Sequence, residues 1–294
     1  MKSSARRLRV ACMAPRAKNW LKEARQAHVL YAFERVINFV NQEGDVLSLV
    51  ENSIGNGPFS LLMAEGPFPD NIQVGVSLLA FENGFWLDDW LIDAESATLW
   101  EPRPDWDAAR RQPANLKLAA QLITDLLREH AEVDSFAQLI LDPTANSPLP
   151  ARILQAAEQN IPLLLSGIQQ SDLEALTLAA KGLAGLGPGL TPAGDDLLLG
   201  VLLGIWAVKT PERAMQLSAA IVRTAAPRTH ALAAAWLTAG AAGEAAAPWH
   251  ELVNAITVGD TQAVQIAAMS ILPTGHTSGA DALGGFLGVI KKTV

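Results

Sequence analysis

The pattern of apolar residues changes from that of strands to that of helices near residues 101–106, "EPRPDW". Before this segment, short β-favouring runs alternate with turn signals: "RVINFVNQEGDVLSLVEN" predicts two strands joined at Gly44. After it, "NLKLAAQLITDLLREHAEV" repeats apolar residues at spacings of three and four. The sequence therefore predicts an α+β protein, in which a small β-rich domain, barrel-like or sandwich-like, precedes a larger α-helical bundle.

These patterns divide the chain into three parts. We expect a basic flexible leader over residues 1–28, a β-rich domain over 29–104 and an α-helical domain over 105–294. In the β-rich part, the Asn83-Gly84 pair predicts a tight hairpin. The leader could be read instead as the start of a signal peptide, but no continuous apolar run follows it.

Composition excludes several classes of function. The net charge of −8 disfavours nucleic-acid binding, which needs clustered Lys and Arg. The longest apolar run, residues 197–208, is too short to span a bilayer and predicts a buried helix. The single cysteine, Cys12, allows no internal disulfide. We expect a soluble, cytoplasmic protein with neither a membrane nor a nucleic acid as partner.

Two stretches of the helical part share one pattern. "GLGPGLTPAGDDLLLG" (185–200) and "GHTSGADALGG" (275–285) both contain a glycine, a threonine and then G-x-D-x-L-x-G. This pattern aligns Asp196 with Asp281. In the first stretch Thr191 and Pro192 stand where a helix N-cap and first helical residue belong, and in the second Ser278 is in a position to cap.

Two interpretations of the repeated pattern are open. Asp and Thr at helix starts are ordinary capping residues, and glycines on helices often mark tight packing. Capping alone, however, does not require "GLGPG" or the adjacent Asp195-Asp196 pair. The double occurrence favours the second interpretation, in which two helix N-termini converge on one small anionic ligand flanked by Asp196 and Asp281.

This second interpretation names candidate residues. His276 adds a group that titrates near neutrality, and Arg228, in "PRTH", could bind a carboxylate unless it merely begins a helix. We take as catalytic candidates Asp196, Asp281 and His276. We take as substrate-binding candidates Gly187, Gly189, Thr191, Asp195, Thr277, Ser278 and Arg228.

No cofactor is indicated by a motif. The paired Asp195 and Asp196 leave Mg²⁺, held through waters, as an alternative. The sequence contains no H-x-x-H spacing, no G-x-S-x-G nucleophile turn and no Walker A loop. Zinc hydrolysis, serine nucleophile chemistry and nucleoside triphosphate binding of that type are therefore disfavoured.

The two motifs also carry a family resemblance. "GLGPGLTPAGDDLLLG" with "GHTSGADALGGFLG" resembles a bacterial family, long known as a domain of unknown function, that includes the AllH-type subunit of oxamate carbamoyltransferase. "RVINFVNQEGDVLSLV" and "GNGPFSLLM" resemble the N-terminal half of the same family, so the resemblance spans roughly residues 30 to 290. No residue roles come with it.

The resemblance implies a function. It implies a subunit of a heteromeric enzyme of allantoin and purine degradation, which transfers the carbamoyl group of oxalurate to phosphate and yields oxamate and carbamoyl phosphate. The implied partners are an FdrA-type subunit and a second large subunit, beside the small anions phosphate, oxamate and carbamoyl phosphate. A non-catalytic assembly or ligand-sensing subunit, and a stand-alone Mg²⁺-dependent hydrolase or lyase, remain as alternatives.

Overall fold

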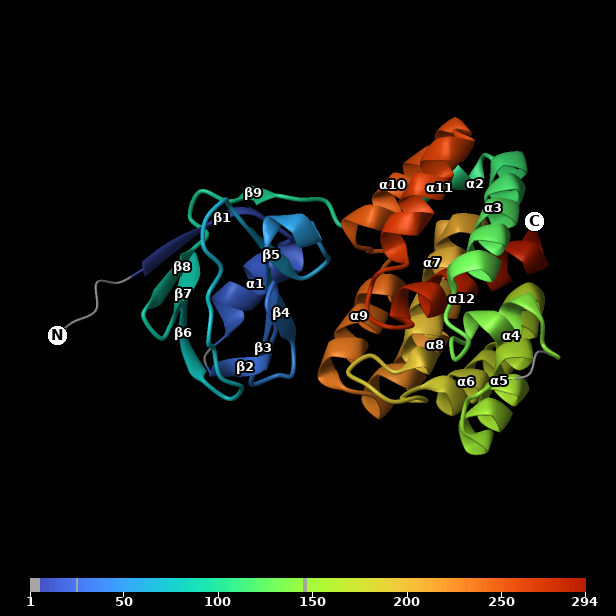
Figure 1. The fold of residues 1–294 in the computed structure, drawn as a ribbon, viewed down its shortest axis with the longest axis horizontal. Coiled ribbons are helices and arrows are strands. Elements are labelled where there is room, and N and C mark those ends of the chain that lie inside the picture. The colour runs from blue at the N-terminus through green and yellow to red at the C-terminus, as the bar shows by residue number, and fades with distance from the viewer. Residues whose placement is uncertain (1–5, 25, 145–146) are drawn as a thin grey trace. The chain divides into compact units, whose positions relative to one another are not determined.

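The computed structural model describes residues 6–24, 26–144 and 147–294. The chain separates into two compact units between Pro102 and Arg103. Strands make up the first unit and helices dominate the second (Figure 1). The α+β fold class predicted from the change of apolar spacing is therefore confirmed.

The first unit is a closed β-barrel. Its strands are β1 (Arg6–Met13), β2 (Ala27–Ala32), β3 (Val36–Asn41), β4 (Val46–Val50), β5 (Ser60–Met63), β6 (Ser77–Phe81), β7 (Gly84–Leu87) and β8 (Trp90–Asp93). Hydrogen bonds join them in the order β5-β4-β3-β2-β6-β7-β8-β1, and β1 pairs with β5 to close the ring. Closure leaves none of these eight strands with an unpaired edge. A short β9 (Thr98–Leu99) pairs alongside β1.

Local sequence accounts for the turns of the barrel. Gly44 has φ of +87°, a conformation that side chains with a Cβ rarely adopt, and it lies between the antiparallel strands β3 and β4 as predicted. The predicted hairpin also forms: β6 and β7 are antiparallel, and Phe81 pairs with Gly84. A Cβ at Gly84 would stand 2.1 Å from the carbonyl oxygen of Ile92 on β8, so glycine is required there for packing as well.

The prediction of a flexible leader is wrong for the described residues between 6 and 24. Residues 6–13 form β1, and α1 (Pro15–Glu23) follows and buries Trp20 in the barrel core. In β1 the side chains of Leu8 and Val10 are buried and those of Arg7 and Arg9 are exposed. Arg6, at the start of the strand, and Arg7 pair with the carboxylates of Asp89 and Asp93. The prediction of a flexible leader rests on the basic residues of "RRLRV", although buried and exposed residues alternate along this segment, as is typical of a strand. Residues 1–5 and 25 lie outside the described residues.

The second unit consists of helices around one apolar core. They are α2 (Trp106–Arg110), α3 (Pro113–His130), α4 (Ala137–Leu141), α5 (Ala151–Gln170), α6 (Leu173–Leu183), α7 (Ala193–Val208), α8 (Pro211–Ala225), α9 (Ala231–Ala241), α10 (Ala247–Val258), α11 (Thr261–Ile271) and α12 (Ser278–Thr293), with a short 3-10 turn, η2 (Ala226–Arg228), between α8 and α9. Within the described residues, none of the helices is both long and apolar enough for a bilayer crossing.

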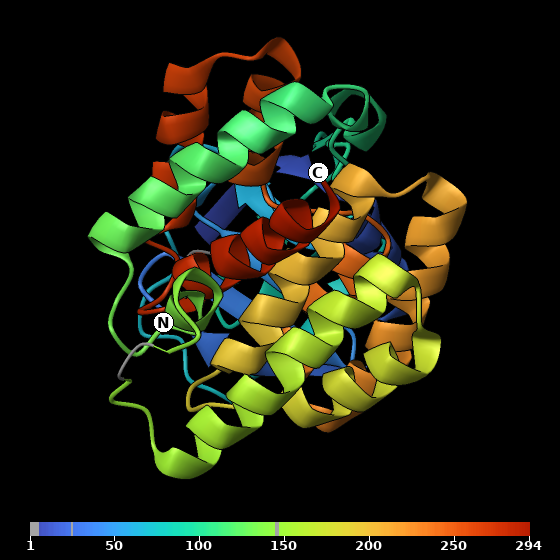
Figure 2. The same cartoon turned by 90° about the vertical axis from the view of Figure 1, so that its right-hand side faces the viewer.

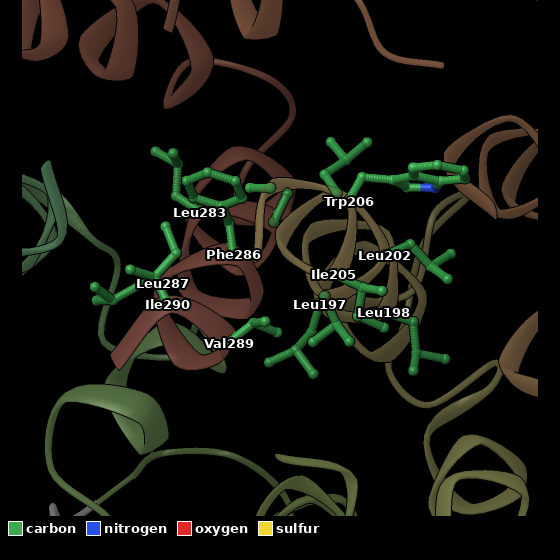
Figure 3. Packing of buried hydrophobic residues seen from close by; sticks show 14 of the residues in the cluster. Leu197, Leu198, Leu202, Ile205, Trp206, Leu283, Phe286, Leu287, Val289 and Ile290 are labelled. Carbon is green, nitrogen blue, oxygen red and sulfur yellow. The ribbon is translucent and has the colours of Figure 1, made fainter. Parts of the chain in front are cut away.

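Helices α7 and α12 form the centre of this unit. They pack side by side, and α12 is the dark red helix of Figure 2. Most residues of both helices are buried, which confirms the buried helix predicted over residues 197–208. Figure 3 shows their apolar side chains meeting, with Leu197 and Leu198 of α7 and Phe286 and Val289 of α12 among them. This central pair carries both copies of the repeated motif.

Candidate functional site

The last glycine of each motif lies where the central helices touch. A Cβ at Gly200 of α7 would stand 1.8 Å from the carbonyl oxygen of Ala282, and a Cβ at Gly285 of α12 would stand 2.2 Å from that of Leu197. Leu197 and Ala282 occupy the same place in the two copies. The two contacts are therefore reciprocal, as across a local two-fold axis, and backbone is packed on backbone.

The first glycine of each G-x-D-x-L-x-G element has an equivalent role. A Cβ at Gly194 would stand 2.1 Å from the carbonyl oxygen of Leu183, the last residue of α6. A Cβ at Gly279 would stand 2.2 Å from that of Ile271, the last residue of α11. Each copy therefore forms the same unit, in which one helix ends directly against the start of the next.

These two units bring the loops before α7 and α12 together. The hydroxyl oxygens of Thr191 and Ser278 lie 3.1 Å apart, within hydrogen-bond distance. Asp196 and Asp281, one turn into each helix, interact electrostatically with each other. The predicted convergence of the two helix starts is thus present in the structure.

Both aspartates are buried. Asp196 is 8% exposed and Asp281 is 0% exposed. The Oδ1 atom of Asp281 accepts hydrogen bonds from Ser135 Oγ at 2.7 Å and from the Phe136 amide at 2.6 Å. The Oδ2 atoms of Asp196 and Asp281 are buried and have no hydrogen-bond partner in the part of the chain that the structure describes. Each carboxyl therefore keeps one oxygen that the protein does not use.

Burial shifts the pKa values of the two carboxyls by different amounts. Loss of solvation, with a smaller contribution from the Asp281 charge, raises the pKa of Asp196 to about 8, although the hydroxyls of Ser278 and Thr191 oppose the rise. Burial raises the pKa of Asp281 to about 6, opposed first by its contact with Ser135. At neutral pH Asp196 is consequently a carboxylic acid, while Asp281 is mostly a carboxylate.

Asp195 is engaged by the protein itself. Its carboxylate accepts a hydrogen bond from the Gly185 amide at 3.1 Å and another from the Thr229 hydroxyl. Burial raises its pKa. Asp195 thus ties the start of the glycine-rich loop to the segment between η2 and α9, and this role as a loop anchor differs from the predicted one in ligand binding.

Capping does not explain the motifs. The N-cap residue of α7 is Pro192 rather than Thr191, that of α12 is Thr277, and neither helix has a side-chain cap hydrogen bond. The predicted capping roles of Thr191, Ser278 and Asp281 are therefore wrong. By contrast, Asp172 and Asp260 do cap α6 and α11 through their side chains, as their positions predict.

Several amides in the first turns of α7 and α12 are already hydrogen-bonded. The Gly194 amide donates to the Leu186 carbonyl at 2.9 Å, and the Asp196 amide donates to that of Pro192 at 3.1 Å. In the second copy, the Gly279 amide donates to the Thr274 carbonyl at 3.0 Å. These amides are not free to hold an anion, so the carboxyl pair rather than the helix dipole distinguishes this site.

The remaining predicted residues lie in the loops before α7 and α12 and in η2. Gly187 and Gly189 have φ of +117° and +99° in the loop before α7, and Gly189 is exposed. His276 is exposed, and its Nε2 lies 3.5 Å from Oδ1 of Asp134. Arg228 directs Nη1 to the Thr224 carbonyl at 2.6 Å, close to the end of α8. These contacts of His276 and Arg228 run to residues other than the two aspartates.

Sequence reasoning missed the residues that hold Asp281. Ser135 lies 146 positions before Asp281, in a segment with no motif of its own. No local signal could have found it. Among residues 6–24, 26–144 and 147–294, no group of three or more His, Cys, Asp or Glu side chains forms a metal-binding arrangement, so Mg²⁺ would have only the paired carboxyls available.

The fold and site define an α+β protein with a barrel unit and a helical unit, whose two central helices carry a buried carboxyl pair. Residues 183–290 match the family model described as oxamate carbamoyltransferase subunit AllH. The match begins at the last residue of α6 and spans both motifs, and over these residues it agrees with the family resemblance inferred from them. No solved structure matches the chain.

Proposed function

We propose that this chain is a subunit of a heteromeric oxamate carbamoyltransferase that converts oxalurate and phosphate to oxamate and carbamoyl phosphate. The observation that carries the proposal is the family match over residues 183–290, which contains both Asp196 and Asp281. The mixed protonation of this buried pair supports a role in the chemistry, because differently shifted carboxyls are typical of acid–base sites.

The reaction requires one proton to move. A phosphate oxygen bonds to the carbamoyl carbon, the bond between that carbon and the oxamate nitrogen breaks, and this nitrogen gains the proton that hydrogen phosphate loses. Asp196, protonated at neutral pH, donates to the leaving nitrogen, and Asp281, as carboxylate, accepts the phosphate proton. Transfer of a proton from Asp281 to Asp196 then restores the pair.

Access to the pair involves the loops and a partner. Thr191 and Ser278 are half-buried and bridge the two loops beside Asp196, and in our proposal this contact opens when substrate binds. The partners we propose are an FdrA-type subunit and a second large subunit, in the cytoplasm. One observation favours the alternative of a non-catalytic assembly subunit: Oδ1 of Asp281 is already used to hold Ser135 and Phe136.

Reconstitution tests the proposal. The full chain is combined with its two partner subunits, and oxamate and carbamoyl phosphate are measured from oxalurate and phosphate. We expect Asp196→Asn to lower kcat by about a hundredfold or more, because the amide cannot give up a proton. Asp125→Asn, an exposed carboxylate on α3, is the matched control and should leave kcat unchanged. An assembly subunit would instead retain turnover in Asp196→Asn.

A further inference from the structure

The two unused carboxyl oxygens call for a common explanation. Oδ2 of Asp196 and Oδ2 of Asp281 belong to residues more than nine-tenths buried, at equivalent positions of the two motifs. A buried acceptor without a donor costs free energy, and native proteins contain few of them. The two carboxyls are close enough for the Asp281 charge to raise the pKa of Asp196, so we consider a single small ligand that satisfies both.

The pair offers one donor and one acceptor. At neutral pH Asp196 carries a proton and Asp281 is mostly charged, so the two groups present an O–H and a carboxylate oxygen. An anionic group without a proton of its own, such as a substrate carboxylate, is disfavoured there, because it would meet the Asp281 charge in a poorly solvated place. A hard cation prefers six or more oxygen ligands, and the described residues provide no cluster of three acidic or histidine side chains.

We infer that Asp196 and Asp281 together bind the terminal carboxamide, –C(=O)–NH₂, of the substrate. In the bound complex, before any proton moves, the Asp196 O–H donates to the carbonyl oxygen and Oδ2 of Asp281 accepts from the NH₂ group. This inference rests on the proposed function, because oxalurate, oxamate and carbamoyl phosphate all carry this group. The anionic end of each molecule is then bound by other groups. The two aspartates bind the carboxamide, which is the group that these three molecules share.

The surroundings of Asp281 fix its orientation for this role. Donors from Ser135 Oγ and the Phe136 amide hold Oδ1, which leaves Oδ2 as the oxygen that a ligand amine can reach. In Asp281→Asn the same two donors keep the amide oxygen at the Oδ1 place and put the amide NH₂ at the Oδ2 place. A donor then faces the NH₂ of the ligand. This variant therefore reverses the polarity of one contact without a change of shape.

The experiment compares oxamate with pyruvate, which has a methyl group in place of the NH₂ group and the same charge. Binding is measured by calorimetry on the full chain, alone and in the reconstituted complex. We expect oxamate to bind at least about tenfold more tightly than pyruvate, and Asp281→Asn to abolish this preference. Asp196→Asn should retain the preference, because its amide still donates to the carbonyl, and Asp125→Asn is the surface control.

A pH series provides a second measurement in case Asp281→Asn does not fold. Oxamate binding to the wild-type chain should weaken as pH rises through about 8, where Asp196 loses its proton, whereas binding to Asp196→Asn should not. Equal binding of oxamate and pyruvate, binding of neither to chain or complex, or a preference that persists in Asp281→Asn would overturn the inference.

These outcomes are separable from those of the proposed function. A complex that makes carbamoyl phosphate without an oxamate preference would refute the carboxamide site and leave the carbamoyltransferase proposal standing. A chain that prefers oxamate to pyruvate in a complex without turnover would refute the carbamoyltransferase proposal and leave the carboxamide site standing. The carboxamide inference therefore has its own readout, which does not depend on catalysis.

Discussion

Gly200 of α7 lies against the carbonyl oxygen of Ala282 so closely that an added Cβ would stand 1.8 Å from that oxygen. Gly285 of α12 has the reciprocal contact with Leu197. Real Cβ atoms do not approach an oxygen so closely, and the neighbour here is backbone at the centre of the helical unit. The aspartates one turn earlier are held together by the same crossing, so the glycines position the site as well as the core.

Substitution of this glycine should therefore be severely destabilising. We expect Gly200→Ala to lower the free energy of unfolding by about 3 kcal/mol or more, because two buried helices must move apart. Urea unfolding followed by circular dichroism measures the change. Gly288→Ala on α12 is the matched control: its Cβ would lie 3.2 Å from the terminal methyl groups of Leu165 and 3.3 Å from that of Ile140, which can give way, so the loss should be smaller. Equal losses in the two variants would refute this explanation.

The buried acids predict that stability falls as pH rises. Their pKa values in the folded chain, about 8 for Asp196 and about 6 for Asp281, exceed the ordinary value of 3.8, so the folded state binds more protons than the unfolded one. Stability is therefore greatest below about pH 4 for these two groups, and it is lost progressively up to about pH 8.

Thermal unfolding of the wild type and of Asp196→Asn between about pH 5 and pH 9 measures this dependence. We expect the melting temperature of the wild type to fall across this range and that of Asp196→Asn to fall less. At about pH 9 the free energy of unfolding of the wild type should have fallen by roughly 3 kcal/mol more than that of the variant. Parallel curves for the two proteins would contradict the assignment of a raised pKa to Asp196.

The hydroxyl of Ser278 should lower the pKa of Asp196. Because its contact lowers the pKa of that carboxyl, Ser278→Ala should raise the pKa above the value of about 8 in the wild type. Carbon-13 NMR titration of labelled aspartate measures the shift. Ser270→Ala, whose hydroxyl donates to the Ala267 carbonyl on α11, serves as the control and should leave the titration unchanged. A lower pKa in Ser278→Ala would show that this hydroxyl does not stabilise the carboxylate.

Ser135 should matter for stability although it belongs to no motif. Its loss removes one of the donors to the fully buried Asp281 carboxylate, which costs about 1–3 kcal/mol and raises the pKa of Asp281 further. Chemical unfolding of Ser135→Ala at neutral pH tests this. Ser166→Ala on α5, whose hydroxyl accepts only an exposed contact from Gln170, should change stability by less than about 0.5 kcal/mol. Similar values for both serines would mean that Asp281 does not depend on Ser135.

Much of the architecture was already present in local patterns of the sequence. The change from two-residue to three- and four-residue apolar spacing predicted strands before helices, and the run of residues 197–208 predicted a buried helix. Such patterns are short-range, because a strand or helix repeats its buried face every two or every three to four residues. The repeated G-x-D-x-L-x-G element likewise marked Asp196 and Asp281 as related before any contact was known.

Only the tertiary structure decided what these related residues do. It turned the basic "RRLRV" segment into a barrel strand with its arginines paired to Asp89 and Asp93, and it joined Asp195 to Gly185 and Thr229. It also supplied Ser135 to Asp281 from 146 positions away. Which charges pair, which groups lose water and which donors reach a carboxyl depend on contacts between segments that are far apart in the chain. A local sequence pattern does not contain this information. The sequence could name the two aspartates, but their burial, and with it their pKa values, arises only when α7 and α12 cross.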